Sequence, residues 1–277
     1  MKSRRISPVL LIGGIIVTAV AILVVAALRH QPLPAPAAVS QPDPGLKPEQ
    51  GPVMLTLPHT SSILAVIENY DLPSSTWVTV SKQHPLADAS YTPGDLDIPP
   101  SNVPSNTQKS REEQSLRRTV FEPTVELFTA AKAAGHDLFI ASGFRSYELQ
   151  KKYFDNYART SGEEAANKYS ARPGQSEHQT GIAFDVSLIS RECYLETCFG
   201  DTTAGKWLAE NSYLYGFIVR YPSDKTAITQ YQYEPWHFRY VGKDLATALH
   251  KSNLTLDEAY PYLQKTLTEL KKRQLVN

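Results

Sequence analysis

Hydrophobic residues are distributed differently in the first 52 residues than in the rest of the chain. Basic residues close to Met1 precede an uncharged, mostly apolar run over 6–28, and Arg29 ends that run. A helix of about 20 apolar residues spans a bilayer core of ~30 Å. Basic residues on its N-terminal side favour a cytoplasmic start. The pattern therefore predicts a transmembrane anchor within residues 1–30, in a single-pass protein of the cell membrane whose remaining chain is extracytoplasmic.

A cleaved signal peptide is the alternative for the same segment. Its apolar stretch is usually shorter, ~7–15 residues, and small residues mark the cleavage site; Ala35, Ala37 and Ala38 offer such residues. No cysteine follows the run directly, which excludes a lipoprotein-type anchor. Many prolines follow the apolar run, and a proline-rich segment is extended and semi-rigid. We therefore expect a proline-rich linker and stalk over 31–75 and a folded domain over 76–277.

In the second region, short strand-like runs alternate with longer segments of helical periodicity. The predicted strands cover 77–80, 138–141, 181–186, 217–219 and 237–241. The predicted helices cover 111–134, 147–159, 207–215, 243–250 and 256–272. Pro123 is expected to split or kink the first helix, and Gly135 to end it. Because no βαβ period repeats, we predict an α+β fold with a small, mainly antiparallel sheet flanked by helices.

Composition narrows the function classes only slightly. The 277 residues carry 28 basic and 28 acidic side chains, so the formal net charge is zero. This balance argues against a generally basic nucleic-acid-binding protein, and we expect no nucleic-acid partner. Two cysteines are too few for a four-thiolate zinc site or an iron–sulfur cluster.

Two of the seven histidines have unusual surroundings. His178 lies in the segment S-E-H-Q-T-G-I-A-F-D, which ends at Asp185, and His237 lies in E-P-W-H. A catalytic zinc needs three nitrogen or oxygen ligands and an open position for water. His178, Asp185 and His237 would supply that set, with Asp185 on one face of a strand. We therefore expect a Zn²⁺ site on the sheet.

Glu234 would complete this chemistry. It precedes His237 by three residues, with a rigid proline between them, so its carboxylate can approach the same water molecule. Such a group can act as general base and later protonate the departing amine. A lone histidine is more often a packing or surface residue, and a lone aspartate on a strand is often a cap or an ion-pair partner. All four residues together favour the catalytic interpretation.

These motifs resemble those of the zinc-dependent D-alanyl-D-alanine carboxypeptidase family of bacterial cell walls, the vancomycin-resistance type. The family pattern S-x-H-x-x-G-x-A-x-D matches Ser176 to Asp185 at every fixed position, and E-x-W-H matches Glu234 to His237. A third element, S-G-[YF]-R-S, matches Ser142 to Ser146, and residues 82–96 are similar to the family's entry segment. The resemblance covers roughly residues 77–242.

The resemblance implies that the two histidines and Asp185 are zinc ligands and that Glu234 is the general base. It places Arg145 near the scissile peptide, where a guanidinium can stabilise oxyanion charge or hold a carboxylate. It also implies substrate hydrogen bonds from Gln150 and Ser176. The alternatives are that Arg145 is a plain surface cation, that Gln150 only lines a helix and that Ser176 only caps a turn.

The two cysteines bracket a short loop after Asp185. Outside the membrane, thiols meet oxidising conditions. We therefore expect a disulfide between Cys193 and Cys198, with two free thiols or zinc ligation as the alternatives.

The leading hypothesis is a zinc carboxypeptidase that removes the terminal D-alanine from peptidoglycan stem peptides. An L,D-carboxypeptidase that trims tetrapeptide to tripeptide would use the same chemistry, and a noncatalytic peptidoglycan-binding module is a second alternative. The chain has no S-x-x-K and no K-T-G, which opposes a serine penicillin-binding mechanism. Phe238 and Arg239 after His237 argue against a lysostaphin-like endopeptidase, which would carry H-x-H there. Peptide length, the third stem residue, the role in wall maturation or resistance, and oligomeric state stay open.

Overall fold

The computed structural model describes residues 55, 57, 66 and 68–274. The anchor expected over 1–30 lies outside the described residues, as does most of the linker expected over 31–75. Among the described helices, none combines the length and the apolar character that crossing a membrane requires.

The centre of the fold is a four-stranded antiparallel sheet with the strand order β3-β4-β6-β5. Its strands are β3 (Leu138–Ser142), β4 (Ala183–Leu188), β6 (Glu234–Tyr240) and β5 (Phe217–Tyr221). A separate short pair is formed by β1 (Leu96–Asp97) and β2 (Leu116–Arg117). The predicted α+β fold with a small antiparallel sheet is confirmed.

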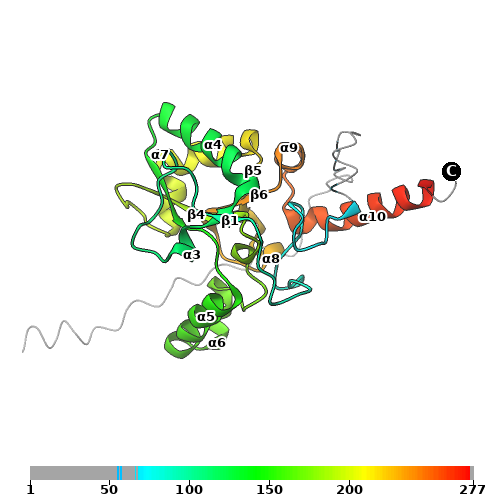
Figure 1. Cartoon of the computed structure of the whole chain (residues 1–277), viewed down its shortest axis with the longest axis horizontal. Coiled ribbons are helices and arrows are strands. Elements are labelled where there is room, and N and C mark those ends of the chain that lie inside the picture. The colour runs from blue at the N-terminus through cyan, green and yellow to red at the C-terminus, as the bar shows by residue number, and fades with distance from the viewer. Residues whose placement is uncertain (1–54, 56, 58–65, 67, 275–277) are drawn as a thin grey trace, which may run out of the picture. The chain divides into compact units, whose positions relative to one another are not determined.

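Helices flank this sheet. Figure 1 shows α5 and α6 side by side, apart from α4 and α7, with the sheet between the two pairs. The α-helices are α3 (Arg111–Gln114), α4 (Phe121–Ala133), α5 (Tyr147–Ser161), α6 (Glu163–Tyr169), α7 (Thr203–Asn211), α8 (Thr226–Thr229), α9 (Lys243–Ser252) and α10 (Leu256–Gln274). The 3₁₀ helices are η1 (Arg118–Val120), η2 (Glu177–Thr180), η3 (Thr197–Asp201), η4 (Ser212–Tyr215) and η5 (Ser223–Lys225).

The main hydrophobic core lies on one face of the sheet. Phe184 of β4 and Phe238 of β6 are fully buried there, together with Leu127 and Phe128 of α4. The rings of Phe184 and Phe128 lie 6.3 Å apart between centroids. Because successive side chains of a strand point to opposite faces, Asp185, which follows Phe184, points away from this core.

A second apolar cluster joins α9 and α10 to the chain that precedes the sheet. Leu245, Leu249 and Leu263 of these helices pack there with Trp77 and Tyr70. Tyr70 is only 3 % exposed, although it precedes residue 76, where the folded domain was expected to begin. Part of the segment expected to be a stalk therefore contributes to the folded core.

The prediction of a strand over 77–80 is wrong. These residues are buried, as their apolar character indicates, but they pair with no neighbouring strand. Arginine side chains take the place of a strand: Arg239 Nη2 donates to the carbonyls of Thr76 and Val78 at 3.0 and 2.7 Å. Arg220 Nη2 donates to the carbonyl of Val80 at 3.4 Å. These three backbone acceptors are thereby satisfied without a sheet.

The helix predicted over 111–134 is divided, but not at Pro123. It is interrupted at 115–120, where β2 pairs with β1 and Arg117 Nε donates to Asp95 at 2.8 Å. Pro123 lies in the first turn of α4. A backbone N–H in that turn has no hydrogen-bond acceptor within the helix, so proline can occupy the position without breaking the helix. Gly135 follows the end of α4 with a φ of +88°, as expected for a C-terminal glycine.

The other predicted elements exist with shifted boundaries. The strand predicted from 181 begins at 183, because Gly181 adopts φ +69° at the end of η2. A Cβ at Gly181 would lie 2.9 Å from side-chain atoms of Arg117 and Leu96, so a side chain is excluded there. The helix predicted over 207–215 is α7 followed by η4, and α6 was not predicted.

Candidate active site

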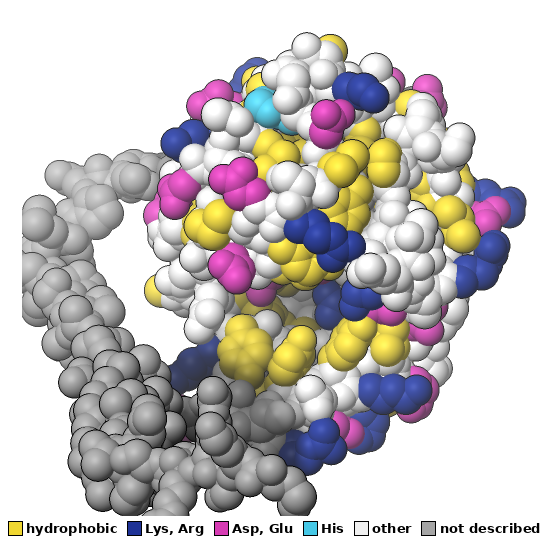
Figure 2. Space-filling view, turned by 90° about the vertical axis from the view of Figure 1, so that its left-hand side faces the viewer, with side chains coloured by type: hydrophobic (Ala, Val, Ile, Leu, Met, Phe, Trp, Pro, Cys, Tyr) yellow, Lys and Arg dark blue, Asp and Glu magenta, His cyan; other side chains and the backbone are white. Residues whose placement is uncertain are grey.

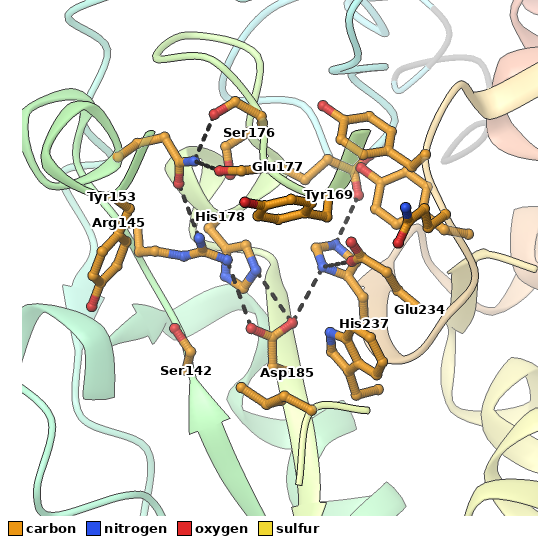
Figure 3. Close-up of a pocket in the computed structure, with 18 of the residues that line it drawn as sticks. Ser142, Arg145, Tyr153, Tyr169, Ser176, Glu177, His178, Asp185, Glu234 and His237 are labelled. Carbon is orange, nitrogen blue, oxygen red and sulfur yellow. Dashed lines mark hydrogen bonds and ion pairs between the residues drawn. The ribbon is translucent and has the colours of Figure 1, made fainter. Parts of the chain in front are cut away.

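Sheet register brings two of the predicted ligands together. Asp185 of β4 and His237 of β6 are direct cross-strand partners, so their side chains project from the same face of the sheet. His178 reaches this point from η2, the turn just before β4. One nitrogen or oxygen atom from each of the three residues lies within 4.8 Å of the others (Figure 3).

The donor atoms of this cluster fit a zinc ion. Asp185 Oδ1 lies 3.4 Å from His178 Nε2 and 3.3 Å from His237 Nδ1. The three residues are buried, and His178 Nε2 and Asp185 Oδ1 have no hydrogen-bond partner. Buried polar atoms are rarely left unpaired. Two imidazole nitrogens and a carboxylate oxygen form a usual ligand set for catalytic zinc.

His178 is oriented by a backbone group. Its Nδ1 lies 2.6 Å from the carbonyl oxygen of Gly143, which leaves Nε2 directed toward the cluster. The backbone at Gly143 packs against α3 and the residue after it: a Cβ at 143 would lie 2.5 Å from the Ser115 carbonyl oxygen and 3.0 Å from that of Glu113. The glycine of the S-G-F-R-S segment is therefore required by close backbone approach.

Glu177 faces the other histidine, and the sequence analysis missed this residue. Its Oε2 lies 3.5 Å from His237 Nε2, so Nδ1 is the ring nitrogen that faces Asp185. Its Oε1 accepts hydrogen bonds from Arg220 Nε at 2.7 Å and Arg239 Nη1 at 2.6 Å. Arg220 lies among apolar residues of β5, and Arg239 lies between Phe238 and Tyr240 of β6; these two charges in strand-like runs were the signal available in the sequence.

Charge around the cluster favours metal ligation. Burial, together with the charge of Arg145, lowers the pKa of His178 to about 4, so this imidazole is neutral at pH 7. Burial opposes ionisation of Asp185, but the neighbouring histidines outweigh it and hold the pKa of Asp185 far below its usual range. For His237, burial is outweighed by Asp185 and Glu177, and its pKa is raised to about 9. A bound cation would therefore displace a proton from His237.

Glu234 lies beside this cluster. Its Oε2 is 3.7 Å from His237 Nδ1, and its side chain is 13 % exposed. Val219 pairs with Phe238 whereas Tyr221 pairs with Glu234, so β6 contains extra residues here. Such an irregularity redirects side chains. Burial raises the pKa of Glu234 to about 7, and a nearby dication would oppose that shift, so the carboxylate can accept a proton near neutral pH.

Arg145 and Gln150 form one unit beside Asp185. Arg145 Nη2 lies 3.7 Å from Asp185 Oδ2, and Nη1 donates to Gln150 Oε1 at 3.0 Å. Gln150 is only 1 % exposed, and its Nε2 donates to the carbonyl of Ala171 at 2.7 Å. Gln150 therefore fixes Arg145 and has little surface left for a ligand. Ser176 precedes η2 but does not cap it with its side chain.

These residues share one cavity of about 570 Å³. Hydrophobic side chains gather around a hollow on the face shown in Figure 2, where charges of both signs are interspersed. Cys193 and Cys198 are joined by a disulfide with Cα atoms 5.5 Å apart, and the residues they enclose reach the cavity. The cavity lining includes Lys109, Ser142, Arg145, Gln150, Tyr153, Tyr157, Tyr169, Ser176, His178, Asp185, Leu195, Glu196, Thr197, Tyr231, Glu234, Trp236 and His237.

Comparisons with a family model and with curated proteins assign this chain to the same family of carboxypeptidases. The family model described as D-alanyl-D-alanine carboxypeptidase (VanY) matches residues 113–243. A relative from Bacillus subtilis (strain 168), the putative carboxypeptidase YodJ, is 41 % identical over 199 residues, which are 72 % of each chain.

Two solved carboxypeptidase structures are also similar to this chain. The LD-carboxypeptidase LdcB is 42 % identical with a TM-score of 0.64, over 68 % of this chain and 87 % of that one. A mutant of the vancomycin-resistance D,D-pentapeptidase VanY, solved in complex with Zn(II), is 32 % identical with a TM-score of 0.50, over 65 % and 95 %. This chain therefore belongs to the zinc-dependent D-alanyl-D-alanine carboxypeptidase family of the vancomycin-resistance type.

Proposed function

We propose that this protein is a zinc carboxypeptidase that releases the C-terminal D-alanine of peptidoglycan stem peptides, with D-Ala-D-Ala ends as its substrate. The observation that carries the proposal is the position of Glu234 beside the His178–Asp185–His237 cluster in one cavity. A ligand set and a buried acid in one cavity are the parts that hydrolysis of a peptide bond requires.

Each residue has a separate task in this reaction. A zinc ion at the cluster would lower the pKa of a water molecule and polarise the scissile carbonyl. Glu234 takes a proton from the attacking water at its carboxylate and returns it to the departing D-alanine nitrogen. His178 keeps its orientation through the Gly143 carbonyl.

Arg145 supplies positive charge where the substrate carries negative charge. Its side chain is 17 % exposed and lines the cavity between Asp185 and Gln150. A guanidinium there can hold the terminal carboxylate or stabilise the developing oxyanion. We therefore assign Arg145 to substrate binding and catalysis. Gln150 then binds substrate only indirectly, through Arg145, and Ser176 is assigned to the cavity wall.

A noncatalytic wall-binding module fits the site less well. Burial raises the pKa of Glu234 to about 7, so keeping an acid at this position costs folding free energy. A scaffold that only bound zinc would not need this acid, whereas a general base does.

L,D-carboxypeptidase activity is the second candidate, and one observation favours it. The LD-carboxypeptidase LdcB shows a higher identity and TM-score to this chain than the zinc-bound D,D-pentapeptidase. Both reactions release D-alanine and differ in the residue before the cleaved bond. The same cluster and Glu234 would serve either.

The experiment that tests the function compares two stem peptides. The purified protein is incubated with a pentapeptide ending in D-Ala-D-Ala and with a tetrapeptide, each with and without a chelator. The masses of the products are then measured by mass spectrometry. We expect the pentapeptide to lose one D-alanine, and the chelator to prevent this. Cleavage of the tetrapeptide alone would establish the L,D reaction. Absence of cleavage by zinc-loaded protein would refute both.

We also propose that the apolar run over 6–28 anchors the protein in the cell membrane and holds the catalytic domain on the outer side. The support is the length of the run and its basic N-terminal flank. Membrane fractionation followed by N-terminal sequencing tests it: a soluble protein beginning near Val39 would show cleavage instead.

A further inference from the structure

A group of buried charges adjoins the metal cluster at the cavity wall and takes no part in the chemical steps described above. It consists of Glu177, Arg220, Arg239 and Asp257. Glu177 and both arginines have side chains with 0 % exposure, and that of Asp257 is 9 % exposed. Arg220 contacts Asp257 through both terminal nitrogens, with Nη2 donating to Oδ1 at 3.2 Å.

The charges of this group balance. Two carboxylates face two guanidinium groups, and Glu177 Oε1 lies between the arginines at 2.7 and 2.6 Å. Buried ion pairs are expensive and are often no more stable than apolar replacements. Stability alone therefore gives a weak reason for placing four charges here.

The geometry gives a stronger reason. Glu177 divides its two oxygens between tasks: Oε1 accepts from the arginines, and Oε2 faces His237 Nε2 at 3.5 Å. The Tyr221 ring lies 5.0 Å from the ring of the same histidine between centroids, and the Arg220 guanidinium lies 4.9 Å from the centre of the Tyr221 ring. Glu177 Oε2 and His237 Nε2 are not hydrogen-bonded at 3.5 Å, but a carboxylate that lies against one ring nitrogen of a histidine favours the orientation in which the other nitrogen faces the metal.

The group also reaches beyond the segment that the family model matches, residues 113–243. Asp257 belongs to the first turn of α10, and the arginines bind carbonyl oxygens of the chain over 76–80. Two segments outside the matched region are therefore linked to a ligand of the metal through a continuous set of ion pairs and hydrogen bonds.

We propose that Glu177 is a positioning residue for His237, and that Asp257, acting through Arg220 and Glu177, lets α10 set the metal affinity of the site. This inference rests on the proposed function only in that the His178–Asp185–His237 cluster holds zinc. It requires no statement about the peptide substrate.

The first test is Glu177→Gln, which keeps the shape of the side chain and removes its charge. Zinc affinity of the metal-free protein is measured by competition with a chromophoric chelator, and folding is followed by circular dichroism. We expect zinc binding about 10–100-fold weaker, the usual effect of removing such a partner. Glu177→Asp keeps the charge and should recover part of the affinity.

Glu113→Gln is a matched control. Glu113 is also a buried carboxylate with an ion pair, to Lys109 at 2.8 Å, and hydrogen bonds to Tyr153 and Ser110, but its side chain contacts no metal ligand. We expect it to lower the melting temperature while zinc affinity stays within about twofold of wild type, because the metal cluster is unchanged. Equal losses of affinity in the Glu113 and Glu177 variants would show a general structural effect and overturn the positioning role.

The second test is Asp257→Asn, at the outer end of the group. We expect a smaller loss of zinc affinity than for Glu177→Gln, in a folded protein. Wild-type affinity in Asp257→Asn overturns the role of α10, and wild-type affinity in folded Glu177→Gln overturns the whole inference. If Glu177→Gln does not fold, Glu177→Asp and Asp257→Asn decide. Wild-type protein that binds zinc but cleaves no stem peptide refutes the proposed function and leaves this inference standing.

Discussion

Phe184 and Asp185 are neighbours in β4, yet their side chains lie in opposite environments. Phe184 is fully buried in the apolar core against α4. Asp185 is also buried, but on a face where ion pairs and hydrogen bonds replace apolar contacts. The same strands thus have one face that holds the fold together and one that holds ligands in place. Each face should respond to a different kind of substitution.

The largest expected effect is on the ligand face. His178→Ala removes one of three donor atoms, so we expect zinc binding and peptide hydrolysis to be lost together. Because the apolar face is untouched, the metal-free variant should remain folded. Metal analysis, product release and circular dichroism measure the three properties. One equivalent of zinc retained by this variant would contradict the assigned site.

Phe184→Ala tests the opposite face at the residue next to Asp185. Truncating a buried phenylalanine leaves a cavity and costs about 3–5 kcal/mol of unfolding free energy. Denaturant unfolding measures this loss. We expect the fraction that remains folded to keep a kcat close to wild type, since no ligand is altered. A variant with unchanged stability but lost zinc would show that the two faces are not independent.

Glu234→Gln separates the chemistry from metal binding on the ligand face. The amide cannot accept the proton of the attacking water, so kcat should fall by at least ~10²-fold. Zinc content should equal that of wild type, because Glu234 is not among the three ligands. Steady-state release of D-alanine, with zinc measured in parallel, checks both points. An unchanged rate would end the assignment of Glu234 as general base.

The smallest effect should come from an ion pair on neither face. Lys243 Nζ and Glu126 Oε2 are 2.8 Å apart, but their side chains are 57 % and 40 % exposed. Solvent screens such pairs, so Glu126→Gln should change the unfolding free energy by no more than ~1 kcal/mol. Urea unfolding of this variant sets the baseline against which Phe184→Ala is judged. A loss as large as that of Phe184→Ala would undermine the ranking.

The apolar face was largely predictable from the sequence, because hydrophobic periodicity reports which side of a strand is buried. The strands at 138–141 and 217–219 and most helices were predicted in this way, and the family motifs identified Asp185, His237 and Glu234. What periodicity could not supply was sheet register, which makes Asp185 and His237 cross-strand partners.

The arginines account for the clearest failures. Arg220 and Arg239 lie in strands as fully buried charges, where pattern analysis expects apolar or exposed residues. Their partners come from distant parts of the chain, so the two arginines signalled a buried acid without identifying it as Glu177. The same side chains bind the carbonyls of the segment over 77–80, which is why an apolar run with strand propensity formed no strand.

The support that His178 receives from Gly143 would escape a conventional alanine scan. The oxygen that binds the ring belongs to the main chain, so no side-chain truncation removes it. Replacing the glycine itself would push a methyl group against the Ser115 carbonyl and would be scored as a folding defect. Variant libraries and directed-evolution campaigns on this protein should therefore keep position 143 invariant and vary its surroundings instead.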